Sequence, residues 1–79
     1  MIVYSVVHKA IHLHFPKRLA DLRQELQMTY EQLAETTAIE VKQLKRFENG
    51  YAKPTLDEVQ NIAAALGVGI DVLLALPVA

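Results

Sequence analysis

The chain has 79 residues, a formal net charge of −1 and no cysteine. That length suits one domain with a small core, and such domains often gain stability by pairing. The lack of cysteine excludes a disulfide framework and a thiolate metal site, and it is compatible with a cytoplasmic location. The apolar stretches 1–7 and 72–79 are too short to span a bilayer, so we expect no membrane partner.

The charges are unevenly distributed along the chain. All eight Lys and Arg residues lie between Lys9 and Lys53, whereas the segment 54–79 carries three charges, all acidic. The net charge alone does not indicate a nucleic-acid partner, but the position of the charges matters more than their sum. The chain is therefore polarised, with a cationic middle and a weakly acidic end.

Residues 1–15 differ from the rest of the chain and favour an extended N-terminal arm. The segment MIVYSVV is rich in β-branched residues, which suits a strand. Apolar and polar residues then alternate through Ile11, His12, Leu13, His14 and Phe15. A strand here would have to pair with another chain or with its own hairpin half. A helix with Val3, Val7 and Ile11 on one face remains an open alternative.

Residues 16–79 predict an all-α domain of five helices. Pro16 suits the first turn of the first helix. One face of that helix carries Phe15, Leu19, Leu22, Arg23 and Leu26. Thr29 with Gln32 forms a capping-box pattern that opens a second helix through about Thr36, in which Leu33 and Ala34 face inward. The charged Arg23 on an apolar stripe is either a snorkelling side chain or the partner of a buried acid.

A connection at 37–39 leads to a third helix from about Val41 to Glu48, which Asn49 and Gly50 close. Thr55 with Glu58 is a second capping box, and it opens a fourth helix that ends at Gly67. Its apolar face carries Leu56, Val59, Ile62, Ala63 and Leu66. A short last helix from about Ile70 to Leu76 completes the set.

The third helix has two chemically different sides. At 100° per residue, Leu44 and Phe47 point one way, with Glu48 beside them. The opposite side carries Lys42, Lys45, Arg46 and Asn49. Such a face is either an ordinary solvated surface or a surface for DNA, because Lys and Arg donate to guanine edges and to phosphates. The preceding helix, the turn and the caps favour DNA.

The segment TYEQLAETTAIEVKQLKRFENGYAKPTLDEVQNIAAALGV resembles the helix-turn-helix of the Cro and phage-repressor family, of the xenobiotic-response-element type. The matching landmarks are Thr29, Leu33-Ala34, Leu44, Glu48-Asn49-Gly50, Lys53-Pro54, Ile62-Ala63 and Ala65-Leu66-Gly67-Val68, with Arg23 in the first helix. The likeness covers about residues 17–76. It implies a lambda-repressor-like DNA-binding domain at 16–79 behind the arm at 1–15.

The resemblance also implies roles for single residues. Base contacts fall on Val41, Lys42 and Arg46, with Glu40 and Gln43 nearby. Phosphate contacts fall on Asn49 and Lys53, and we add Thr29, Tyr30 and Lys45 as further phosphate candidates. Arg23 and Glu48 fall where the family makes a buried ion pair, and both also lie on inward helix faces. We therefore expect Glu48 to be structural.

Several positions depart from the family pattern. Tyr30 stands where glutamine is usual, and its hydroxyl is expected to donate to a phosphate. Gln27 and Ala38 stand at two glycine positions, and a left-handed Gln27 would be mildly strained. Glu40 stands at a helix N-cap where Ser or Thr is usual. Near phosphates its charge is unfavourable, and the alternative is that it accepts from a cytosine amine. Val41 offers only an apolar contact, for instance to a thymine methyl group.

No constellation in the sequence predicts catalysis, so we expect no enzyme and no cofactor. His8, His12 and His14 do not share one face on either a helix or a strand, and no acidic residue lies near them. We therefore predict no metal site.

These patterns predict a homodimeric, sequence-specific regulator of transcription, most simply a repressor, that binds double-stranded DNA with the helix at 41–48 in the major groove. Two half-sites about one helical turn apart would supply specificity. The favoured dimerisation surface is the arm, through Ile2, Val3, Tyr4, Val6 and Val7. The alternative surface is the tail, through Leu74, Leu76 and Val78. The runner-up function is a protein-interaction module, such as an antitoxin with a toxin-like partner.

Overall fold

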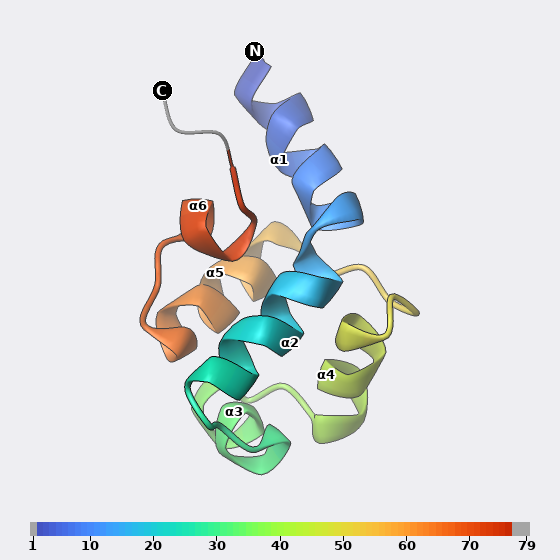
Figure 1. The fold of residues 1–79 in the computed structure, drawn as a ribbon. Coiled ribbons are helices and arrows are strands. Elements are labelled where there is room, and N and C mark those ends of the chain that lie inside the picture. The colour runs from blue at the N-terminus through green and yellow to red at the C-terminus, as the bar shows by residue number, and fades with distance from the viewer. Residues whose placement is uncertain (1, 77–79) are drawn as a thin grey trace.

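The computed structural model describes residues 2–76, and for residues 2–5, 8 and 12 it describes the backbone alone. Six helices make up this part of the chain (Figure 1). In order they are α1 (Ile2–Leu13), α2 (Phe15–Glu25), α3 (Tyr30–Thr37), α4 (Val41–Glu48), α5 (Leu56–Leu66) and α6 (Ile70–Leu73). The all-α class and the five predicted helices, which are α2 to α6, are confirmed, but α6 ends at Leu73 and not near Leu76 as predicted. No helix within residues 2–76 is both long and apolar enough to cross a bilayer.

The predicted extended arm is wrong, because residues 2–13 form the helix α1. Ala10 is buried against the core, and Val7 and Ile11 pack on the same side at helical spacing. A helix satisfies its own backbone hydrogen bonds, whereas a lone strand beside helices would leave them unpaired. β-branched residues lower helix propensity by only a few tenths of a kcal/mol each, so this packing outweighs the local preference.

The centre of the core joins α2 to α4. Phe15 of α2 and Phe47 of α4 are fully buried and meet edge to face, with ring centroids 5.8 Å apart. Leu19, Leu33 and Leu44 are also fully buried around them. This apolar contact fixes the inner side of α4, and consequently the direction in which its outer side points.

Two helices begin at complete capping boxes, as predicted. The Thr29 hydroxyl accepts from the Gln32 amide at 3.0 Å, and the Gln32 side chain accepts from the Thr29 amide at 2.8 Å. Thr55 and Glu58 repeat both bonds at the start of α5, at 3.1 and 2.8 Å. Each box pairs two backbone donors that a helix start leaves free.

Two leucines predicted on inward faces are instead exposed. Leu26 follows the last residue of α2 and is 48% exposed, and Leu56 is the first residue of α5 and is 45% exposed. Both lie at helix ends, where the helical face no longer covers the core. The helix α6 is tied to α2 because the Arg18 guanidinium donates twice to the Val72 carbonyl, at 2.8 and 3.2 Å.

Candidate nucleic-acid interface

The helices α3 and α4 are joined by a three-residue turn, residues 38–40. Ala38 is left-handed, with φ of 60°, and its amide donates to the Ala34 carbonyl at 2.8 Å. This is the position at which the family pattern has a turn glycine and this chain has alanine. The turn lets α4 begin at Val41, in agreement with the predicted bounds of 41–48.

Three hydrogen bonds that the sequence did not predict hold this turn. The Thr37 hydroxyl donates to the Leu33 carbonyl at 2.7 Å and accepts from the Ile39 amide at 3.2 Å. The Asn61 side chain of α5 donates to the Thr37 carbonyl at 2.7 Å. The bond from Asn61 crosses 24 residues, so no local pattern could have revealed it. The hydrogen bond from α5 therefore helps to hold the turn between α3 and α4.

The outer face of α4 is cationic. Its three cations and the amide that follows them are all exposed: Lys42, Lys45, Arg46 and Asn49. The inward Leu44 and Phe47 are 0% exposed. Within residues 2–76 none of the three cations forms an ion pair, because the two ion pairs present join Lys17 to Asp21 and Arg23 to Glu48. The face therefore presents positive charge that is free to meet a polyanion.

The start of α4 carries no side-chain cap. Glu40 occupies the N-cap and is exposed, and its carboxylate makes no capping hydrogen bond. The amides of the first turn of α4 are consequently not satisfied by that side chain. Val41 and Gln43, which were named with Glu40 as base-contact candidates, are half-buried beside it.

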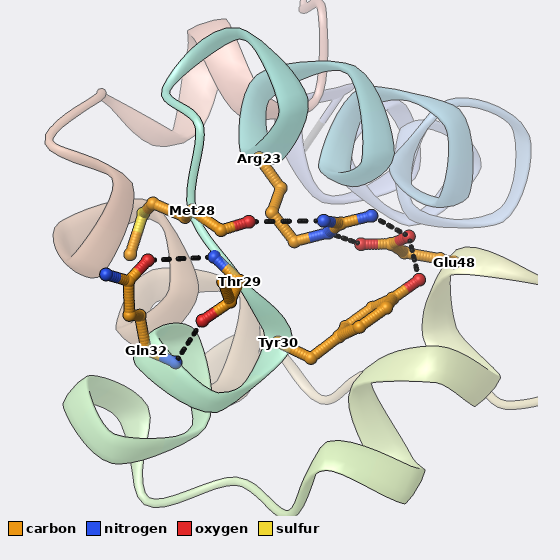
Figure 2. A network of polar contacts seen from close by, with 6 residues as sticks. All are labelled: Arg23, Met28, Thr29, Tyr30, Gln32 and Glu48. Carbon is orange, nitrogen blue, oxygen red and sulfur yellow. Dashed lines mark hydrogen bonds and ion pairs between the residues drawn. The ribbon is translucent and has the colours of Figure 1, made fainter.

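A polar network joins α2, α3 and α4 beneath the cationic face (Figure 2). Arg23 donates to both Glu48 oxygens, at 2.6 and 3.1 Å, and also to the Met28 carbonyl at 3.2 Å. The Arg23 side chain is 13% exposed and that of Glu48 is 6% exposed. The hydrogen bond to Glu48 raises the pKa of Arg23, although burial opposes the shift. The structure thus brings the predicted pair together, and Arg23 does not snorkel.

Tyr30 belongs to this network, which differs from the expectation of an outward phosphate contact. Its hydroxyl donates to Glu48 Oε1 at 2.9 Å, and a hydroxyl has only one proton to donate. This hydrogen bond, reinforced by burial, raises the pKa of Tyr30. The structure therefore gives the Tyr30 hydroxyl a structural partner.

The remaining phosphate candidates lie just before α3 and just after α4. Thr29 is exposed, but its hydroxyl is engaged in the capping box. Asn49 and Lys53 are exposed in the segment that follows α4, where Gly50 takes the predicted left-handed conformation with φ of 75°. The Tyr51 carbonyl accepts from Arg46 at 3.5 Å, which is a weak contact.

The candidate dimerisation residues are only partly placed. The side chains of Ile2, Val3 and Tyr4 lie outside the described residues, as do those of His8 and His12 and the whole of Val78. Val7 packs against the core, while Val6 lines an apolar pocket beside the turn at residues 74–76, the C-terminal turn. Leu74 is fully buried, which removes it from the alternative tail surface.

A family model described as helix-turn-helix matches residues 19–73. Since the match covers well over half of the chain, the protein belongs to the helix-turn-helix family of the Cro and phage-repressor type, a family of DNA-binding transcriptional regulators.

A similar protein is the cryptic phage CTXphi transcriptional repressor RstR of Vibrio cholerae. It is 35% identical over 57 residues, which make up 72% of this chain and 51% of the relative. The chain thus spans about half the length of the curated relative that it matches.

Proposed function

We propose that this protein is a transcriptional repressor that binds double-stranded DNA as a homodimer, with α4 in the major groove. The observation that carries the proposal is the unpaired cationic face of α4, formed by Lys42, Lys45 and Arg46 on a helix whose inner side is buried. The similar protein of Vibrio cholerae is a transcriptional repressor, which supports repression.

The face has the chemistry that groove binding requires. Lys42 and Arg46 supply donors for base edges, and Lys45, Asn49 and Lys53 supply donors for phosphates. A helix held by a buried ion pair presents these groups in one orientation, which limits the ordering cost on binding. We assign half-buried Val41 and Gln43 to apolar and polar contacts at the groove floor.

We place the dimer contact on α1 and the C-terminal turn. In Figure 1, α1 rises from the body at the end away from α3 and α4, so pairing through α1 leaves the cationic face free. Leu13 of α1 is 66% exposed, and Val6 and Leu76 line the adjoining apolar pocket. A second α1 would cover this apolar surface, and an isologous contact would give two-fold symmetry.

Selection from a random duplex library at moderate salt tests the proposal. A palindromic motif, with half-sites separated by about 10 base pairs or a multiple of that spacing, is the expected result. Binding without any motif, or no binding, would reject sequence-specific recognition.

The contribution of the charged face is measured as the salt dependence of Kd. Lys45→Ala should lower the slope of log Kd against log salt by about 0.9 if Lys45 meets one phosphate. Lys17→Ala is the matched control, because Lys17 is an exposed lysine on α2 that is already paired with Asp21. An equal change in both variants would indicate a general charge effect.

The dimer contact is tested by sedimentation. Leu13→Asp and deletion of residues 1–5 should each shift the protein toward monomers, since both disturb α1. A protein that stays dimeric in both variants would place the interface elsewhere.

The second candidate function is a protein-interaction module with a toxin-like partner. The apolar pocket between α1 and the C-terminal turn favours it, because such a surface also suits a foreign apolar side chain. If this were the main function, Leu13→Asp would abolish partner binding while Lys42, Lys45 and Arg46 could be replaced without effect.

A further inference from the structure

Tyr30 makes contacts that go beyond its hydrogen bond. The Arg23 guanidinium carbon lies 4.1 Å from the centroid of the Tyr30 ring, and the Lys45 Nζ lies 5.3 Å from the same centroid. Both distances fall within the range of cation–π attraction. One side chain of α3 therefore meets a partly buried cation of α2 and an exposed cation of α4.

The ring itself is fixed in place. Its hydroxyl donates to Glu48, which is held in turn by two bonds from Arg23 (Figure 2). Tyr30 is half-buried, so one part of the ring faces the network and another part remains open to Lys45. Because the ring is held in place, it can restrict the position of a cation that packs against it.

Lys45 is the cation of α4 that gains from such a contact. A lysine carries a flexible four-carbon stem, and ordering that stem on binding weakens the complex. Among the described residues, Lys42 and Arg46 make no comparable contact with the ring. The three cations of the face are consequently not equivalent.

We propose that Tyr30 is a positioning residue that orients Lys45 for its contact with the DNA backbone and links that contact to the buried ion pair. The proposal rests on the proposed function of DNA binding. It assigns to the tyrosine that replaces the family's glutamine a task different from direct contact with DNA.

A double-mutant cycle on binding to the selected duplex tests this assignment. Tyr30→Leu removes the ring, and we expect it to weaken Kd about two- to fivefold when Lys45 is present, as an exposed cation–π contact implies. In the Lys45→Ala background the same change should have no effect. In the Lys42→Ala background it should keep its full effect, because Lys42 does not meet the ring.

Tyr30→Phe supplies a second, milder variant that keeps the ring and removes only the hydroxyl. It should preserve the coupling to Lys45 at least in part, even if Tyr30→Leu loosens the fold. Equal losses from Tyr30→Leu in all three backgrounds would overturn the proposal, because a merely structural role does not depend on Lys45.

A measurement without DNA separates this proposal from the proposed function. In the free protein, the methylene protons next to Lys45 Nζ should show a ring-current shift that Lys42 lacks and that Tyr30→Leu removes. Identical shifts for both lysines would overturn the proposal. Failure of the wild-type protein to bind any duplex would instead reject the proposed function, whatever the lysine shifts show.

Discussion

The helices α3 and α4 have equal length but are held in place by different means. α3 begins at a capping box made by its own neighbours in sequence, Thr29 and Gln32. α4 begins at Val41, after an N-cap residue, Glu40, that makes no capping bond. Its position depends on the buried Leu44 and Phe47 and on the Glu48 side chain, which is bonded to α2 and α3. The start of α3 is determined by neighbouring residues, whereas the position of α4 is determined by contacts with the rest of the fold.

This difference suits the proposed division of labour. Because α4 is fixed through its inner side, its outer side and its first turn remain free for a ligand. The cost is that α4 cannot keep its position if the network beneath it is lost. Four predictions test this comparison, ordered from the largest expected effect to the smallest.

The largest effect is expected from Glu48→Ala. This change leaves the Arg23 guanidinium buried without a counter-ion, and the Tyr30 hydroxyl loses its acceptor as well. Breaking such a pair costs about 3–5 kcal/mol of unfolding free energy, which approaches the whole stability of a small domain. Urea denaturation measures the loss.

The matched control for Glu48→Ala is Lys17→Ala. Lys17 pairs with Asp21 at 3.0 Å, but its side chain is 81% exposed. An exposed pair at this helical spacing contributes about 0.3–0.5 kcal/mol. Similar losses in the two variants, or an unchanged melting temperature in Glu48→Ala, would contradict a structural role for the buried pair.

Tyr30→Phe should have a smaller effect that depends on pH. At pH 7 it removes a hydrogen bond to a charged group, at a cost of about 1.5 kcal/mol. Because the pKa of Tyr30 is raised in the folded state, its hydroxyl contributes stability below its ordinary pKa of about 10 and loses that contribution as the pH rises through the folded value. The difference between wild type and variant should therefore shrink in denaturation series run above about pH 10. A gap that is constant with pH would show that the hydroxyl does not donate to Glu48.

Thr29→Ala and Glu40→Ala compare the two helix starts directly. The first removes a capping hydrogen bond and should lower stability by about 1 kcal/mol. The second removes a side chain that caps nothing, so stability should stay nearly constant, while DNA affinity should rise because a negative charge is lost near phosphates. A stability loss in Glu40→Ala as large as that in Thr29→Ala would remove the distinction between the two helices.

The smallest effects are expected in the two connections that flank α3. Gln27 and Ala38 are left-handed, with φ of 54° and 60°, where a side chain is strained. Gln27→Gly and Ala38→Gly should each raise the free energy of unfolding by about 0.5–1 kcal/mol. The melting temperature should rise with it. Ala64→Gly is the control, because Ala64 lies inside α5 and glycine there costs about 1 kcal/mol. A loss of stability at all three positions would mean that the left-handed residues carry no strain.

The same distinction between local and tertiary information explains what the sequence could predict. The start of α3 follows from Thr29 and Gln32, and the end of α4 follows from Gly50, because these residues act on their immediate neighbours. The helix α1 was only the alternative prediction, because its β-branched residues favour a strand locally, whereas its packing partners lie on other elements. The bonds from Tyr30 to Glu48 and from Asn61 to Thr37 join residues 18 and 24 positions apart, and they were missed because neither helix faces nor the family resemblance paired these residues.

The bonds from Arg18 to the Val72 carbonyl have a consequence for the order of folding. They join residues 54 positions apart, the widest separation among the side-chain hydrogen bonds of the described chain. Closing so long a loop costs entropy that short-range helix pairing does not. We therefore expect α3 and α4 to dock on α2 early and α6 to arrive late, so that the C-terminal turn is the first part to open when the protein unfolds.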